Sequence, residues 1–351
     1  MKRILVSLAV LVIVGCSAAA GIMRGNPTDI VQGVAESTQN VAALSQDLSK
    51  CDSLGTADVT FDEERTIGGT VALNWVQQGG GLMVDPSPGT DASVPSPKTL
   101  AVADTPRNKL SKYLNVVGRN LAARSARPTL QWTFGVLDSQ VVNAVSAPGG
   151  YVFVTRGMLQ RVDNEAALAG VLSHEIAHVT RKDAFLIYQK TKVDQCKTLA
   201  YAKAGQKEGM GALRNYGPGF IKTAIYALDS FSGGPLDLNA AANAALLTLF
   251  SDEFVHRYLE SGYARDQELG ADAIGLELTV ATGYNPRGFI DFVGGLPPGP
   301  AFFAHHPPGA DRVAAMRFLL ARKGSTPFSA FAQDTILLPR VPLHDELAAV
   351  K

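Results

Sequence analysis

Residues 174 to 178 read His-Glu-Ile-Ala-His, within a stretch whose apolar residues recur at helical spacing. Two histidines four positions apart project from one face of a helix, so His174 and His178 can ligate one ion while Glu175 lies beside it. Imidazole nitrogens suit Zn²⁺, and a site with three protein ligands leaves one position for water. The alternative is a pair of core histidines on an apolar helix.

A second cluster, Glu268-Leu269-Gly270-Ala271-Asp272, lies on another predicted helix. Glu268 and Asp272 are one helical turn apart and share a face. A zinc site with two histidines needs a third ligand, and its histidines need acceptors for their other ring N–H groups. Glu268 can supply the ligand and Asp272 the acceptor. The alternative is two solvated carboxylates on an exposed helix.

Taken together, four segments resemble the M48 family of zinc metallopeptidases, the gluzincins, in its bacterial periplasmic lipoprotein form. These segments occur in the family's order over roughly residues 107 to 320, at 143–150, 174–178, 265–275 and 305–312. The resemblance implies one Zn²⁺ per chain, held by His174, His178 and Glu268. It also implies that Asp272 supports a ligand and that Glu175 is the catalytic base.

The resemblance extends to residues beside the metal. Asn143 and Ala144 match a segment that forms an edge strand in the family, where an extended peptide can pair through backbone hydrogen bonds. His306 matches a histidine that stabilises the oxyanion or occupies the open zinc position, and a surface-loop role is the alternative. Arg312 follows it as a substrate-binding candidate. Gly270 departs from the family pattern, and close helix packing would explain it.

The predicted fold class is α+β, a mainly helical metallopeptidase domain with a small β-sheet whose edge strand borders the zinc cleft. Periodicity and turn residues predict the elements. Asp163 or Asn164 can cap the helix that carries the histidines. Helices are expected near 25–50, 62–78, 107–125 and 252–280, and strands at 129–136, 141–145 and 151–155.

The chain begins with features of an exported protein. Lys2 and Arg3 precede an apolar stretch, Ile4 to Val14, that is too short to span a bilayer and predicts a signal peptide at 1–15. Residues 13–16 resemble the lipobox of bacterial lipoproteins, which makes Cys16 the lipidated residue. An ordinary signal peptide with a chance cysteine is the alternative. We expect the periplasmic face of a bacterial envelope, a membrane contact through the lipid, and the outer membrane as the favoured location.

The predicted domains follow composition. Residues 16–106 form a lipid-anchored segment with helices and a Gly/Pro/Ser-rich linker, 107–325 the metallopeptidase domain with a helical insertion at about 184–250, and 326–351 a C-terminal tail. The net charge is zero with no basic run, which argues against a nucleic-acid partner. Cys51 and Cys196 form either a disulfide or two buried thiols.

These features predict a zinc-dependent endopeptidase in which Glu175 activates water for attack on a peptide carbonyl. The resemblance implies that its partners are unfolded or extended polypeptides, from misfolded or unassembled envelope proteins. The alternative is a peptidase-like lipoprotein that acts mainly as a chaperone or assembly factor.

Overall fold

The computed structural model describes residues 27–85, 105–232, 235–236, 243–296 and 309–322 of the 351 residues. The chain divides into two compact units. We call Phe61–Ile187 with Val255–Lys351 the sheet unit, and Met1–Thr60 with Tyr188–Phe254 the helical unit. Cys16, His306 and the predicted tail lie outside the described residues, and the predicted domain limits stay predictions.

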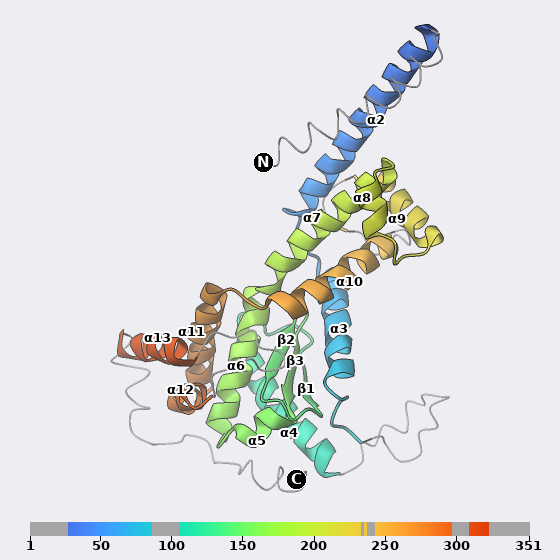
Figure 1. Cartoon of the computed structure of the whole chain (residues 1–351). Coiled ribbons are helices and arrows are strands. Elements are labelled where there is room, and N and C mark those ends of the chain that lie inside the picture. The colour runs from blue at the N-terminus through green and yellow to red at the C-terminus, as the bar shows by residue number, and fades with distance from the viewer. Residues whose placement is uncertain (1–26, 86–104, 233–234, 237–242, 297–308, 323–351) are drawn as a thin grey trace. The chain divides into compact units, whose positions relative to one another are not determined.

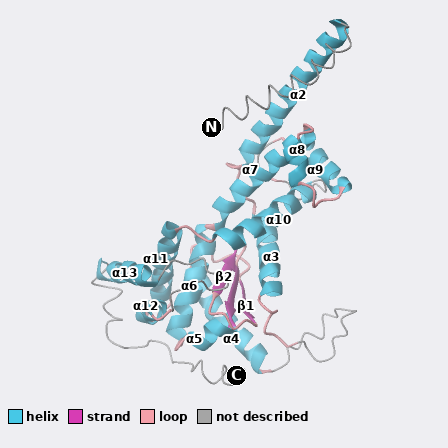
Figure 2. Ribbon diagram, in the orientation of Figure 1, coloured by secondary structure: helices cyan, strands magenta, loops and turns pink. Residues whose placement is uncertain are grey.

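The sheet unit contains a three-stranded mixed sheet in the order β1-β3-β2. β1 (Thr133–Leu137) is parallel to β3 (Tyr151–Thr155), and β2 (Ala144–Ala147) is antiparallel to it. Helices make up most of the rest, as Figures 1 and 2 show. This arrangement confirms the predicted α+β class, with β2 at an edge of the sheet.

Two of the three strands begin later than predicted. The N–H of Leu130 donates to the carbonyl of Arg127 and the indole of Trp132 donates to the same carbonyl, so a turn precedes β1. Before β2, the hydroxyl of Thr155 donates to the carbonyl of Val141, and this side-chain bond replaces ladder pairing. Local side-chain hydrogen bonds therefore make the two strands begin later than their β-branched residues alone would predict.

Alternating side chains place helices on both faces of the sheet. Val152 and Val154 are buried in the main core with apolar residues of α4 (Pro106–Ala122) and α6 (Glu165–Arg181). Between them, Phe153 lies edge-on to Trp75 of α3 (Phe61–Gln78), with ring centroids 6.4 Å apart. Because successive residues of a strand point to opposite faces, α3 covers one face and α4 with α6 the other.

Both ends of α6 are fixed by local chemistry. The Asn164 side chain accepts a hydrogen bond from the N–H of Ala167 at 2.9 Å, which confirms one of the two predicted caps. The helix ends at Lys182, whose φ of 61° is in the left-handed region. The N–H of Asp183 then donates to the carbonyl of His178 at 3.1 Å, so the chain folds back beside the helix end.

The single helix expected over 252–280 is divided. The structure has α10 (Asn243–Ser261) and α11 (Arg265–Ala281), separated by Gly262 with a φ of 60°. A left-handed residue cannot continue an α-helix, and glycine adopts this conformation at little cost. α12 (Pro286–Gly294) and α13 (Gly309–Arg322) follow, and α12 contacts both α6 and α13.

Helix α11 packs closely on α6, the helix that carries the histidines. A Cβ added at Gly275 would come within 2.9 Å of the His174 backbone nitrogen, so glycine is required there for the backbones to approach. A Cβ at Gly270 would instead collide with the guanidinium of Arg181. Gly270 thus makes room for the Arg181 side chain near the end of α6. The close approach of the two helix backbones is at Gly275, later in α11.

The helical unit contains α2 (Pro27–Leu54), α8 (Lys207–Ala212), α9 (Pro218–Ser230) and most of α7 (Ala184–Lys203) and α10. These elements confirm the predicted helices at 25–50 and in the 184–250 segment. A disulfide joins Cys51 to Cys196, which resolves the alternative left by the sequence. Within the described ranges, none of the helices has the length and apolar content needed to span a membrane.

The contrast between the two glycines of α11 is testable. Gly275→Ala should lower the free energy of unfolding by about 1–3 kcal/mol, because the new methyl group meets helix backbone. Gly270→Ala should be much milder, because a flexible guanidinium can move and alanine favours the helix by up to about 1 kcal/mol. Urea unfolding followed by tryptophan fluorescence reports on the sheet unit, which holds both tryptophans. Equal stability of Gly275→Ala and the wild type would contradict the packing argument.

Candidate metal centre

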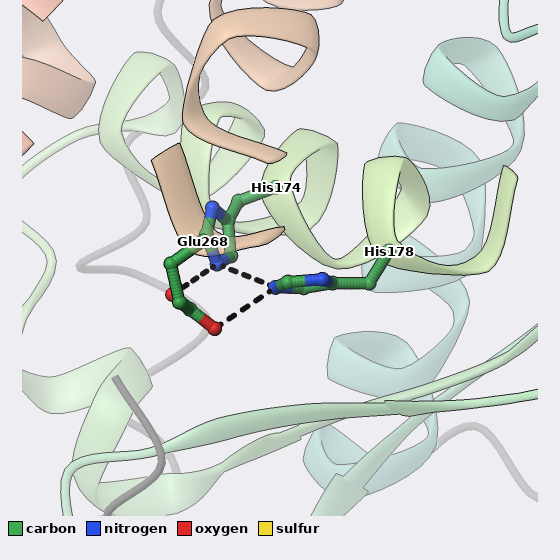
Figure 3. A group of neighbouring side chains, drawn as sticks. All are labelled: His174, His178 and Glu268. Atoms are coloured by element: carbon green, nitrogen blue, oxygen red, sulfur yellow. Dashed lines mark hydrogen bonds and ion pairs between the residues drawn. The ribbon is translucent and has the colours of Figure 1, made fainter. Parts of the chain in front are cut away.

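Three buried side chains converge from α6 and α11 (Figure 3). The Nε2 atoms of His174 and His178 are 3.1 Å apart. Glu268 Oε2 lies 3.5 Å from the first ring and Oε1 lies 3.3 Å from the second. Among the described residues this is the one group of three side chains with the spacing of a metal site. The structure therefore brings together the three ligands that the sequence predicted.

Carboxylates fix the orientation of both imidazole rings. His174 Nδ1 lies 2.9 Å from Asp272 Oδ1, and His178 Nδ1 lies 2.8 Å from Asp183 Oδ2. A carboxylate accepts a hydrogen bond, so each Nδ1 carries a proton, and in the neutral form that binds a metal each ring then has its lone pair on Nε2. Both lone pairs are then on the atoms that face Glu268. This pattern is that of metal-ligating histidines with outer carboxylate partners.

The donor set fits a zinc ion. Two ligands at tetrahedral positions on Zn²⁺, each about 2.0–2.1 Å from the ion, are about 3.3–3.4 Å apart. The Nε2–Nε2 separation of 3.1 Å and the distances of 3.5 and 3.3 Å from the two rings to the two oxygens of Glu268 lie close to this value. Charge points the same way. Of the four carboxylates Glu175, Glu268, Asp183 and Asp272, the third pairs with Arg181 and the fourth with Arg312, and a divalent cation would balance the negative charge that remains.

Arg312 holds the carboxylate behind His174. Its Nε and Nη2 donate to the two oxygens of Asp272 at 2.8 and 2.7 Å, a bidentate pair. Arg312 is buried, with an exposed fraction of 5%, and Nη2 lies 3.4 Å from His174 Nδ1. These contacts connect α13 to the metal centre through Asp272.

The outer residues also set the charge of the site. Burial and the charge of Arg312 lower the pKa of His174, but hydrogen bonds to Asp272 and Glu268 outweigh them and raise this pKa to about 9. For Asp272, burial opposes ionisation, but hydrogen bonds from Arg312 and His174 hold its pKa well below the usual range. Asp272 therefore remains ionised, and the carboxylates favour positive charge at His174, which either a proton or a metal ion on Nε2 would supply.

The sequence did not reveal Asp183 as a partner of His178. Asp183 follows the end of α6, where the left-handed Lys182 turns it back toward the histidine. Arg181 Nε donates to Asp183 Oδ2 at 3.1 Å and steadies the carboxylate. A signal was present, because the carboxylate lies five residues after the second histidine, just beyond the helix. Its role depends on the helix stop, which residue spacing alone does not give.

Glu175 and the edge strand meet beside the histidines. The hydroxyl of Ser146, in β2, donates to Glu175 Oε2 at 2.7 Å in a buried contact. On the other side, the ring of Tyr263 stacks on His178 with centroids 4.1 Å apart and planes 17° apart. Burial raises the pKa of Tyr263 well above its usual value, so its hydroxyl remains protonated. Neither Ser146 nor Tyr263 was among the residues that the sequence suggested.

The remaining predicted residues have mixed outcomes. Ala144 is the first residue of β2, and Asn143 precedes it with its N–H bonded to the Thr155 hydroxyl at 3.1 Å. The side-chain amide nitrogen of Asn143 is buried without a hydrogen-bond partner among the described residues. Substrate contacts for Asn143, Ala144 and Arg312 stay predictions. So does the role of His306, which lies outside the described ranges.

A buried His-His-Glu centre on two packed helices, with a glutamate following the first histidine and a strand beside it, defines a metallopeptidase-type site. Comparison with known families agrees. The description "Peptidase family M48" matches residues 108–319, more than half of the chain. The chain belongs to peptidase family M48.

Relatives come from bacteria and mitochondria. A "Beta-barrel assembly-enhancing protease" of Yersinia pestis is 23% identical over 184 residues, which cover 52% of this chain and 32% of the relative. The human mitochondrial metalloendopeptidase OMA1 is 27% identical over 194 residues, covering 52% of this chain and 31% of the relative. The Escherichia coli (strain K12) "Beta-barrel assembly-enhancing protease" is 28% identical over 111 residues, covering 30% and 23%. The chain thus spans no more than about a third of the length of these relatives.

The newly found carboxylate should matter for metal binding. Loss of an outer partner of a ligating histidine costs about 10- to 100-fold in metal affinity, so Asp183→Ala should weaken zinc binding by this factor, as should Asp272→Ala. Chelator competition measures the affinity. Asp266→Ala is the matched control, because Asp266 is exposed in the first turn of α11. Zinc affinity in Asp183→Ala equal to that of the control would show that Asp183 is structural only.

Proposed function

We propose that this protein is a zinc-dependent endopeptidase that hydrolyses peptide bonds by Glu175-assisted attack of water. The observation that carries the proposal is the convergence of two imidazole Nε2 atoms and one carboxylate, next to a glutamate that faces the edge strand. Membership of a peptidase family supports it. His174, His178 and Glu268 are the proposed zinc ligands, and Asp272 and Asp183 are their outer partners.

Each group of the site has a place in the proposed reaction. When bound, zinc supplies Lewis acidity, which polarises a carbonyl and makes water more acidic. Glu175 accepts the proton from water and returns it to the amine nitrogen that leaves. The Ser146 hydroxyl holds one carboxylate oxygen of Glu175 and so orients the base. Asp272 and Asp183 keep the proton on Nδ1 of each histidine.

The edge strand suggests how a substrate is aligned. Among the strands of the described residues, β2 pairs with β3 alone and on one side, and β2 runs past Glu175. An extended polypeptide can add to such an edge through backbone hydrogen bonds, which makes binding tolerant of sequence. We assign Asn143 and Ala144 to this surface. For Arg312 we propose positioning of Asp272 in place of direct substrate binding, because its guanidinium donates twice to that carboxylate.

Unfolded or extended polypeptides, from misfolded or unassembled envelope proteins, are the proposed substrates. Two of the relatives carry the name "Beta-barrel assembly-enhancing protease", which supports a role in quality control. The disulfide between buried Cys51 and Cys196 supports an oxidising compartment such as the periplasm. Lipidation at Cys16 and an outer-membrane location remain part of the proposal.

A chaperone or assembly factor that keeps the zinc site is the second candidate function. The edge strand favours it as much as it favours a peptidase, because strand addition binds a polypeptide without cleaving it. The ordered contact between Ser146 and Glu175 favours the peptidase, since a base has to be oriented only when water is to be activated. His306 keeps its two proposed roles, transition-state donor or ligand at the open metal position.

Substitution at two neighbouring positions separates ligand from base. Glu175→Gln should retain zinc and lose cleavage of reduced, alkylated casein, because the amide cannot take a proton. His178→Ala should lose both zinc and cleavage. Zinc content by atomic absorption and peptide release by gel are measured on the same samples. A Glu175→Gln protein that lost its zinc would show that base and ligand have been confused, and full cleavage by this variant would show that Glu175 is not the base. Binding of casein by the zinc-loaded wild type without any cleavage would support the chaperone.

Orientation of the base is tested at Ser146. Ser146→Ala should lower kcat by about 10-fold or more with unchanged zinc content, because hydrogen bonds to charged groups contribute about 1.5–3 kcal/mol. Ser146→Thr keeps a hydroxyl and should recover most of the lost rate. Steady-state cleavage of a quenched fluorescent peptide gives kcat and KM separately. Equal kcat values for the alanine and threonine variants would argue against an orienting role.

A further inference from the structure

Two tyrosine hydroxyls connect the edge strand to a metal ligand. Tyr258, in α10, donates its hydroxyl hydrogen to the backbone carbonyl of Ser146 at 2.8 Å. The same oxygen is hydrogen-bonded to the hydroxyl of Tyr263, whose ring stacks on His178. Because the Tyr258 hydrogen is used on Ser146, Tyr263 is the donor between the two hydroxyls. The chain of contacts runs from His178 to the backbone of β2.

The Ser146 carbonyl lies on the side of β2 that faces away from β3. The carbonyl of Asn143 accepts from the N–H of Thr155 at 3.0 Å, so the backbone groups of Asn143 face β3. In an antiparallel pair, neighbouring residues turn these groups to opposite sides. The backbone groups of Ala144 and Ser146 therefore point away from β3, toward the side where another strand would add. Tyr258 occupies one of the acceptors on that side.

We propose that Tyr258 is a specificity residue whose hydroxyl holds the place of a substrate backbone N–H at Ser146. This role rests on the proposed function and sets a condition that a substrate must meet in order to bind. An extended polypeptide pairs with β2 when one of its N–H groups replaces the Tyr258 hydroxyl. A folded chain, whose N–H groups are already bonded, offers no replacement donor, and neither does a proline at that position. The exchange therefore favours polypeptides whose backbone N–H groups are not already hydrogen-bonded.

The surroundings of Tyr258 allow its hydroxyl to be removed without loss of packing. Its ring lies 5.8 Å from that of Trp75 and 5.6 Å from that of Tyr263, and the residue is 5% exposed. Phenylalanine keeps these ring contacts and loses the donor. The left-handed Gly262 separates α10 from α11 four residues later. Tyr258 therefore lies in the last turns of α10, close to the end of the helix.

The test measures binding in the absence of cleavage. Fluorescein-labelled, reduced and alkylated casein is titrated with the zinc-loaded full chain carrying Glu175→Gln, with and without Tyr258→Phe, and followed by anisotropy. Removal of the competing donor should tighten binding by about 2- to 10-fold, the worth of one neutral hydrogen bond. Tyr284→Phe is the control, because its buried hydroxyl donates to Glu165, away from β2, and binding should not change. Unchanged or weaker binding in Tyr258→Phe would overturn the proposal.

A second measurement does not depend on how well the Tyr258→Phe variant folds. 3-Fluorotyrosine at position 258 of the Glu175→Gln protein should change its ¹⁹F chemical shift when saturating casein displaces the hydroxyl. A shift that stays constant at saturation would overturn the proposal. Hydrolysis is measured separately, with the chain that retains Glu175. Tighter binding in Tyr258→Phe without hydrolysis in any protein would support the edge-strand exchange while ruling out the peptidase.

Discussion

The sheet unit depends on one electrostatic constraint, which is that carboxylates buried around two histidines must be compensated. Glu268 is fully buried, and Asp272 and Glu175 are nearly so. A buried carboxylate without compensation costs several kcal/mol, so each of these groups needs a cation or a donor. Arg312 compensates Asp272, the Ser146 hydroxyl bonds Glu175, and Glu268 faces the two imidazoles. A divalent ion held by the histidines and Glu268 would complete this balance, and metal binding would then stabilise the unit.

The constraint also explains why the helices have their particular ends and contacts. His174 and Asp272 can meet only if α6 and α11 approach closely, and Gly275 permits this at the His174 backbone. His178 receives its carboxylate from the turn that ends α6, where the left-handed Lys182 redirects the chain. Each histidine is thus supported by a different structural device. Arg312, which is distant in sequence, holds Asp272 in place through two hydrogen bonds.

Much of the fold and the inner site could be predicted because the signals are local. A four-residue spacing on a helix determines that His174 and His178 share a face, and the same spacing joins Glu268 to Asp272. Asp183 and Tyr263 were missed because their contacts depend on the left-handed Lys182 and Gly262, and spacing alone does not predict φ. The grouping of the N-terminal segment with 188–254 in one unit depends on tertiary packing and on the disulfide, neither of which a linear pattern contains.

Ser146 contacts the proposed catalytic base and lies in the edge strand where a polypeptide is proposed to bind. Its side chain points toward α6 and bonds Glu175, while its carbonyl points along the sheet plane to the free edge and bonds Tyr258. Both directions follow from the strand geometry, because side chains stand perpendicular to the sheet and backbone groups lie within it. A register shift of one residue would turn the Ser146 hydroxyl away from the base and its carbonyl toward β3. Under the proposed function, a polypeptide that pairs with this edge would lie beside Glu175 at a position that the antiparallel pairing of β2 with β3 determines.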